Sequence, residues 1–212
     1  MKKIIFLIFI ILIVGTFFMN KNYEKVFNNY DIIYKEDETT ITFISNNSVN
    51  ALLINDNKNE NELIILNYKS IKKLKKGLKK LEISNVKNIY NITPVIINMF
   101  NTTSKTLIPD KNDLIKLKYN NKDFCIYMNN NNIKKHIDCN FIYIYKFNSE
   151  NIPIFGNNVN IVFQNYNNRL PISTEETLYE NWIDIYTLTP YEYVTLKLLK
   201  DSFDIIIIPI VK

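Results

Sequence analysis

His136 is the only histidine in the chain, so any acid–base or metal chemistry that needs an imidazole must use it. It ends a polar segment, residues 132–136, in which Lys134 and Lys135 precede it. That setting is typical of a surface histidine rather than of a Ser–His–acid triad. The chain has three glycines in 212 residues and no Gly-rich phosphate-binding loop. No residue pattern therefore indicates an enzyme, and we expect no catalytic residues and no cofactor.

The two cysteines, Cys125 and Cys139, are 14 residues apart. In an oxidising compartment they could form a disulfide. The alternative is that both are small apolar residues in neighbouring strands. A metal site is not expected, because His136 is the only imidazole and no third or fourth ligand lies at a useful spacing.

One predicted helix carries a dense group of lysines, with apolar residues spaced along a single face. Ile71, Leu74, Leu78 and Leu81 fall at helical spacing and predict a helix over residues 70–81, with Ser70 as its N-cap. The other faces carry Lys72, Lys73, Lys75, Lys76, Lys79 and Lys80. These lysines could contact DNA, an anionic membrane or an acidic partner. The alternative is an ordinary solvated face, which the lack of interleaved aromatic residues favours over nucleic-acid binding.

The N-terminal residues have the layout of a membrane-targeting segment. Lys2 and Lys3 precede an apolar run that begins at Ile4 and continues to Met19. Because no small-x-small cleavage pattern follows, we expect an uncleaved signal anchor over residues 1–19, with secretion after cleavage as the alternative. The two lysines would keep the N-terminus in the cytoplasm and place the rest outside the cell membrane. We predict a stalk at residues 20–39 and one domain at 40–212.

The overall composition limits the classes of function. The chain has 34 Asn, 37 Ile and 25 Lys but one arginine, Arg169. With 47% hydrophobic and 22% charged residues it is not disordered, and a net charge of +5 is mild for a nucleic-acid-binding protein. The lysine helix is therefore the one feature that could report such a role.

The rest of the chain is predicted to be rich in strands. Strand patterns lie at residues 40–44, 49–54, 62–66, 86–92, 114–119, 124–128, 141–147, 159–164, 182–187, 193–199 and 204–211. Asn120 and Asn121 predict a hairpin turn. Ser173 and Glu176 have the spacing of a capping box and predict a short second helix. Its carboxylates, Glu175, Glu176 and Glu180, are explained by the helix dipole.

Several segments resemble a known family in order and in local sequence. Residues 50–54 (NALLI) and 63–67 (LIILN) hold the places of two opening strands in the extracellular metallo-β-lactamase-like domain of ComEC-like DNA-uptake proteins. Residues 161–171 (IVFQNYNNRLP) are similar to that family's strand and Asn-x-Tyr-Gly-His-Pro stretch, and residues 182–187 to a later strand. The resemblance covers roughly residues 40–208. It implies an α/β (α+β) fold, a metallo-β-lactamase-like αββα sandwich, here preceded by one N-terminal hydrophobic helix.

The resemblance fails at the metal ligands. The family's Thr-His-x-His-x-Asp-His motif corresponds to residues 93–99 (TPVIINM), and its late His to Leu170. Its other ligand positions fall near residues 129–130 and 147–149, which also lack metal-binding side chains. The predicted signal anchor, the family-like strand order and the missing ligands together favour a membrane-anchored, extracytoplasmic, non-catalytic domain that binds an unknown protein partner or nucleic acid. The resemblance implies a link to DNA uptake or the cell envelope. The alternative is a β-rich envelope or adhesion protein, which an all-antiparallel sandwich without the lysine helix would favour.

Overall fold

The computed structural model describes residues 38–46, 49–56, 60–93, 95–111, 113–128, 136–146 and 152–209. The chain divides into two units, Met1–Lys35 and Glu36–Lys212, and all the described residues belong to the second. The predicted signal anchor, residues 1–19, lies outside the described residues, as does nearly all of the predicted stalk. In the ranges described, neither helix has the length and hydrophobicity needed to cross a bilayer.

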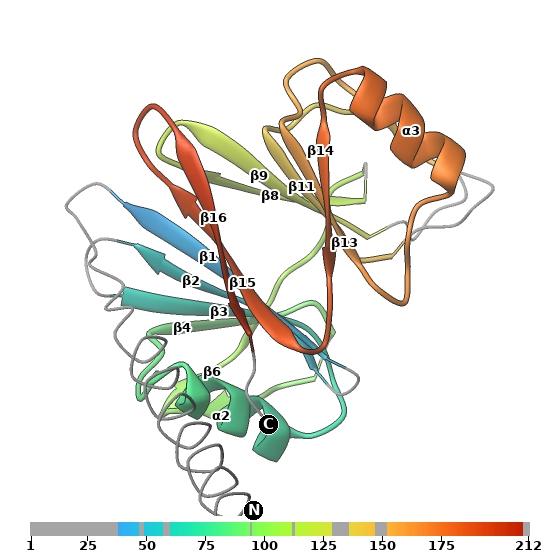
Figure 1. Cartoon of the computed structure of the whole chain (residues 1–212). Helices are drawn as coiled ribbons and strands as arrows, with labels where there is room; N and C mark the ends of the chain where they lie inside the picture. Colours follow the sequence, from blue (N-terminus) through green and yellow to red (C-terminus); the bar gives the residue numbers. More distant parts are fainter. Residues whose placement is uncertain are drawn as a thin grey trace, which may run out of the picture. The chain divides into compact units, whose positions relative to one another are not determined.

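The first sheet has seven strands in the order β16-β15-β1-β2-β3-β4-β7 (Figure 1). Its first five strands pair antiparallel, and β3, β4 and β7 pair parallel, so the sheet is mixed. The strands are β1 Thr39–Asn46, β2 Val49–Asp56, β3 Glu60–Tyr68, β4 Asn88–Asn91, β7 Lys105–Thr106, β15 Glu192–Leu198 and β16 Phe203–Pro209.

The second sheet has five strands in the order β14-β13-β11-β9-β8. Only β8 is antiparallel, joined to β9 by the hairpin turn at Asn120 and Asn121, which both have positive φ. Asparagine tolerates this left-handed conformation better than most residues. The strands are β8 Leu114–Tyr119, β9 Lys122–Tyr127, β11 Phe141–Ile144, β13 Ile161–Asn165 and β14 Asp184–Leu188. Two small ladders pair β5 Asn98–Met99 with β6 Thr102–Thr103, and β10 His136–Ile137 with β12 Ile154–Phe155.

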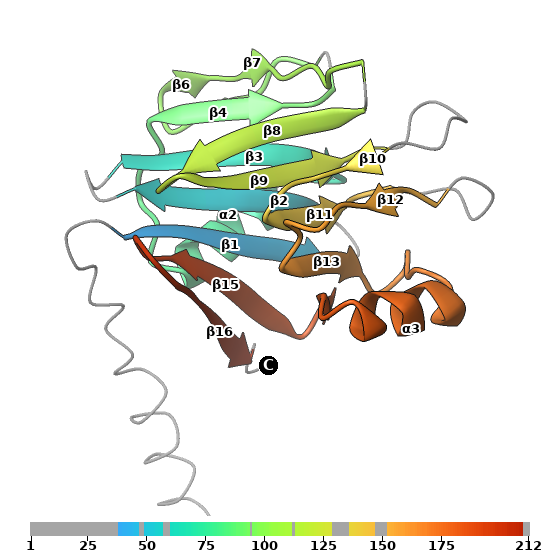
Figure 2. The ribbon, with the colours of Figure 1, turned by 90° about the horizontal axis from the view of Figure 1, so that it is seen from above.

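The two sheets pack face to face around one large apolar core (Figure 2). Alternate residues of each strand point into it, as the two-residue period of a strand requires. Phe43 of β1 lies at its centre, with ring centroids 4.5 Å from Phe163, 5.4 Å from Tyr143 and 6.1 Å from Phe124. Three of those four rings come from the second sheet, so aromatic packing holds the two sheets together.

One helix covers the outer face of each sheet (Figure 1). Helix α2, Ile71–Lys80, buries Leu74 and Leu78 against the outward residues of β1, β2 and β3. Helix α3, Ile172–Glu180, buries Leu178 against the second sheet. The described layers are therefore helix, sheet, sheet, helix. The all-antiparallel sandwich without a helix is wrong for this chain.

The ends of the helices differ in part from the sequence prediction. Ser70 occupies the N-cap of α2, as predicted, but its side chain makes no capping hydrogen bond. The Ser173–Glu176 capping box is wrong, because α3 begins earlier, with Pro171 at the N-cap and Ser173 inside the first turn. Pro171 has φ −57° and ψ 145°, which lies outside the helical region, so the first turn starts at Ile172.

Candidate functional site

A cluster of neutral polar side chains closes one edge of the space between the sheets. We call Ser45, Asn50, Tyr143 and Asn165 the amide cluster. Asn165, at the end of β13, donates from Nδ2 to Ser45 Oγ at 2.9 Å and to Asn50 Oδ1 at 3.2 Å. Ser45 Oγ donates to Asn50 Oδ1 at 3.0 Å. The β1–β2 hairpin is thereby tied to the second sheet at the ends of its parallel strands.

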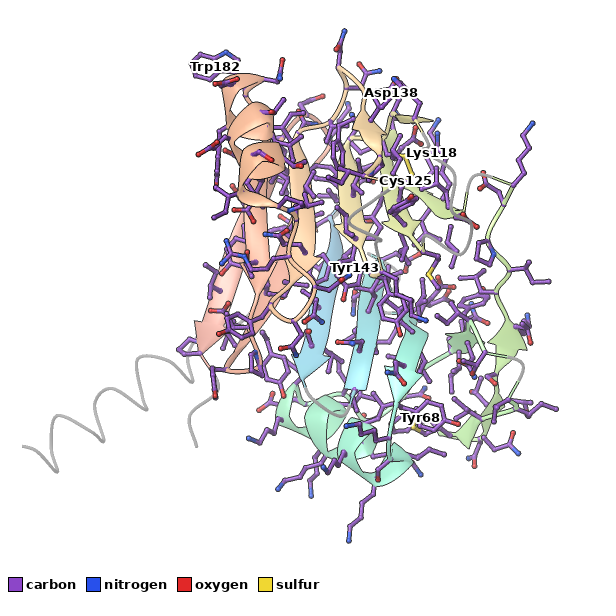
Figure 3. All side chains as sticks on the ribbon, turned by 90° about the vertical axis from the view of Figure 1, so that its right-hand side faces the viewer. Tyr68, Lys118, Cys125, Asp138, Tyr143 and Trp182 are labelled. Carbon is purple, nitrogen blue, oxygen red and sulfur yellow. A yellow bond between two sulfur atoms is a disulfide. The ribbon has the colours of Figure 1, made fainter. Side chains whose placement is uncertain are left out.

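Tyr143 of β11 is the aromatic member of the amide cluster and lies between the sheets (Figure 3). Burial raises the pKa of its hydroxyl well above the ordinary value, and a side-chain hydrogen bond with Asn165 opposes that shift in part. The hydroxyl is therefore neutral at physiological pH. Since the other members are amides and a serine hydroxyl, the amide cluster carries no charge and offers no general base.

A second polar tie runs beside the amide cluster. The hydroxyl of Tyr145 donates to the backbone oxygen of Leu66, at the end of β3, at 3.1 Å. Asn168 donates from Nδ2 to the backbone oxygen of Tyr145 at 3.3 Å. Burial raises the pKa of Tyr145 as well, so this tie is also neutral at physiological pH. Both ties satisfy buried polar groups and fix the geometry of this edge.

The segment after β4 is held by another asparagine. Asn91 is buried and donates from Nδ2 to the backbone oxygen of Val95 at 2.8 Å. Its Oδ1 accepts from the backbone N–H of Thr93 at 3.2 Å and from the Thr93 hydroxyl at 3.0 Å. An amide therefore shapes this turn by hydrogen bonding to its backbone, as asparagine commonly does in Asx turns.

A third network, which the sequence analysis missed, lies under α3. Gln164 is fully buried, and its Oε1 accepts from the Leu170 backbone N–H at 2.8 Å. Its Nε2 donates to Glu175 Oε1 at 2.7 Å and to Thr187 Oγ1 at 2.9 Å. Arg169 forms an ion pair with Glu175 at 3.1 Å. Glu175 is therefore held by Arg169 and Gln164, so the helix dipole alone does not explain why a glutamate is present at this position. In the sequence, the one feature that could have indicated this network was Arg169, the one arginine in the chain.

The described side chains of this edge do not suit a catalytic metal centre. Zinc and similar ions need imidazole, thiolate or carboxylate ligands that converge on one point. In the described part of the chain, no three His, Cys, Asp or Glu side chains lie close enough to hold an ion. Leu170 is buried among apolar residues, and His136 is exposed on β10. Residues 129–130 and 147–149 lie outside the described residues.

The lysine face of α2 points away from the first sheet. Lys72, Lys73, Lys75, Lys76, Lys79 and Lys80 are all exposed. The helix contains no acidic residue, and its opposite face packs on the sheet through Leu74 and Leu78. Lys72, Lys76 and Lys80 project most directly outward, because they lie opposite the buried Leu74 and Leu78 at 100° per residue. This face is a compact array of positive charge on a rigid element.

Cys125 and Cys139 are joined by a disulfide, with their Cα atoms 6.1 Å apart (Figure 3). Cys125 belongs to β9 and Cys139 follows β10, and both are buried beneath the outer face of the second sheet. The bond closes a 14-residue separation across the segment that holds His136. It therefore fixes the entry into β11, the strand that carries Tyr143.

A cavity of about 610 Å³ lies between α3 and residues 152–157. Its α3 wall carries hydroxyl and amide side chains, and Leu178 and Ile183 supply apolar contacts. None of its lining residues is charged; they are Ile152, Pro153, Ile154, Phe155, Gly156, Asn157, Ser173, Thr174, Thr177, Leu178, Asn181 and Ile183. This cavity is separate from the amide cluster and offers no acid–base chemistry.

Comparison of the chain with protein-family models, with curated proteins and with solved structures finds no match.

Proposed function

We propose that this chain is a non-catalytic binding domain of the metallo-β-lactamase-like αββα class, held outside the cell membrane by residues 1–19. The observation that carries the proposal is the neutral amide cluster at the edge where the family's ligands would converge. Asn165 Nδ2 and Ser45 Oγ donate to partners within the amide cluster and so hold the two sheets together, and none of its side chains is a metal ligand of the kind that activates water.

The fold assignment rests on the order of the elements and on their layers. Three strands precede the lysine helix, later strands form the second sheet, and α3 covers that sheet. The same order motivated the family resemblance in the sequence. A β-rich envelope or adhesion protein is the alternative function, and an extracytoplasmic location is common to both.

The disulfide supports the extracytoplasmic location. Disulfides persist in oxidising compartments and are rare in reducing ones. Cys125 and Cys139 are both buried, so their bond belongs to the packed interior. Together with the predicted signal anchor, this favours a domain exposed at the outer face of the membrane.

Binding through α2 is the mode that the charges favour. Six exposed lysines on one rigid helix attract polyanions, and a nucleic acid is the polyanion that the link to DNA uptake implies. With Arg169 engaged by Glu175, base-specific recognition by arginine forks is not expected. We therefore propose that contact with nucleic acid is electrostatic and independent of sequence.

Metal analysis of the purified full chain tests the non-catalytic part of the proposal. Protein is prepared in detergent micelles, exposed to Zn²⁺ or Mn²⁺ and freed of excess ion. We expect far less than one bound ion per chain and no metal-dependent cleavage of DNA, phosphodiesters or β-lactams above a protein-free blank. Stoichiometric metal, or hydrolysis that a chelator abolishes, would show that the non-catalytic assignment is wrong.

A further inference from the structure

The last strand, β16, is an edge strand with an unusual composition. It is seven residues long and pairs with β15 on one side; among the described residues no strand pairs with its other side (Figure 2). Its centre is four consecutive isoleucines, Ile205–Ile208. An edge strand presents unpaired backbone N–H and C=O groups, so it can accept a further strand.

Both faces of β16 are apolar. Ile205 packs at the rim of the core between the sheets, and Ile208 packs at the rim of the core under α2. Ile207 stays 48% exposed. Because successive side chains of a strand point to opposite faces, a strand that meets water on its edge usually carries polar residues on at least one face. The centre of β16 carries none.

The other sheet edges are protected in the usual ways. Strand β8 places Lys116 and Lys118 on its exposed positions, and β14 begins with the exposed Asp184. Strand β7 is two residues long and includes the exposed Lys105. Charges and short length both discourage pairing between molecules. Of the four edges of the two main sheets, β16 is the one whose central residues lack such protection.

We propose that β16 pairs antiparallel with β16 of a second copy of this chain, about a two-fold axis through Ile206. In that register Ile205 lies opposite Ile207 of the second copy, on the same face, and each face of the sheet continues across the axis. The nearest charge, Asp204, lies opposite Ile208 of the second copy, so no like charges face each other. An identical strand thus matches the apolar faces and the charge pattern at the centre of this edge, and Pro209, which has no N–H to donate, lies at the end of the pairing opposite Phe203 of the second copy.

Cross-linking of the full chain in detergent micelles tests the pairing. Residue 206 would face its own copy, with Cβ atoms about 4.5–5.5 Å apart, which is close enough for a disulfide. We expect Ile206→Cys to form a covalent dimer under mild oxidation, at several times the yield of Thr106→Cys, which places a cysteine on the exposed β7 edge. Equal yields of the two variants would overturn the proposal.

Light scattering, which measures the oligomeric mass, provides a second test of the proposed β16 pairing. We expect the wild type to be dimeric and Ile207→Lys to lower dimer affinity at least about tenfold, because the proposed pair would acquire two lysines at an apolar contact. Ile207→Thr keeps a β-branched, uncharged residue and should stay dimeric. A monomeric wild type at up to about 100 µM, or a dimer that Ile207→Lys leaves intact, would overturn the proposal. If Ile207→Lys fails to fold, the cross-linking yields decide alone.

Discussion

Asn165 and Ser45 are 120 residues apart in sequence, yet Asn165 Nδ2 donates to Ser45 Oγ at 2.9 Å. The bond joins the end of a parallel strand in one sheet to the tip of a hairpin in the other. At this edge amide and hydroxyl groups satisfy one another's hydrogen bonds. The relationship shows how neutral side chains far apart in sequence join the two sheets.

Asn165→Ala tests whether the amide cluster is structural. The change leaves Ser45 and Asn50 without a shared donor, so we expect a loss of about 1–3 kcal/mol in the free energy of unfolding. Urea denaturation of wild type and variant measures the loss. Asn167→Ala is the control, because that side chain is exposed and two residues away. Equal effects of the two changes would contradict a structural role for the amide cluster.

The two described helices, α2 and α3, each end in a Schellman motif whose left-handed residue is not glycine. Trp182 follows α3 with φ 61°, and Glu82 follows α2 with φ 59°. The Ile183 and Ile83 backbone N–H groups donate back to Leu178 and Leu78 at 2.9 and 3.0 Å. Glycine is preferred at such a position because a Cβ atom is unfavourable there. Only three glycines occur in the chain, which fits the absence of glycine at both ends.

We expect Trp182→Gly to raise the free energy of unfolding by about 1 kcal/mol, through relief of left-handed strain. Trp182 is 93% exposed, so little packing is lost (Figure 3). Trp182→Ala keeps the Cβ atom and should gain nothing. Thermal and urea unfolding of the three proteins would measure the difference. If the alanine and glycine variants were equally stable, the strain argument would fail.

Most of the fold was predicted from the sequence, because in long helices and strands the regular spacing of apolar residues matches the face that each element buries. The lysine helix, the paired asparagines between β8 and β9, and the long strands were found close to their observed bounds. The two-residue strands β5, β6, β7, β10 and β12 were missed, since pairing rather than local pattern creates them. Gln164 was also missed: its partners Leu170, Glu175 and Thr187 come together only when α3 folds over β13.

The buried tyrosines predict a loss of stability at high pH. Burial raises the pKa of Tyr143, and burial together with Glu192 raises the pKa of Tyr186 to about 12. Their unfolded-state pKa is near 10, so between that value and the folded pKa the folded state holds more protons. Stability should therefore be unaffected by these groups below about pH 10 and fall above it, by about 1.4 kcal/mol per pH unit for the buried Tyr143 and by less for Tyr186, which is only partly buried.

Urea denaturation between pH 8 and pH 11.5 measures that slope. Tyr143→Phe removes one buried titrating group and should make the slope shallower. A slope that is the same in the wild type and in this variant would mean that Tyr143 is not protected in the folded state.

The disulfide is expected to contribute to stability. Closing a 14-residue separation restricts the unfolded chain and is worth about 3 kcal/mol in the chain-entropy account. Reduction should therefore lower the urea midpoint of the wild type and leave a Cys125→Ala, Cys139→Ala variant unchanged. A wild type whose midpoint is the same with and without reductant would contradict the prediction.

The salt dependence of DNA binding tests the central claim, that this domain works by binding through the lysine face of α2. If three outward lysines contact phosphates of duplex DNA, the slope of log affinity against log salt should be near −3, at about −0.9 for each phosphate. Changing Lys72, Lys76 and Lys80 to Gln should bring the slope close to zero. The control, with Lys105, Lys118 and Lys200 changed to Gln, loses the same charge elsewhere and should keep it. No binding at low salt, or equal slopes in the two triple variants, would contradict the claim.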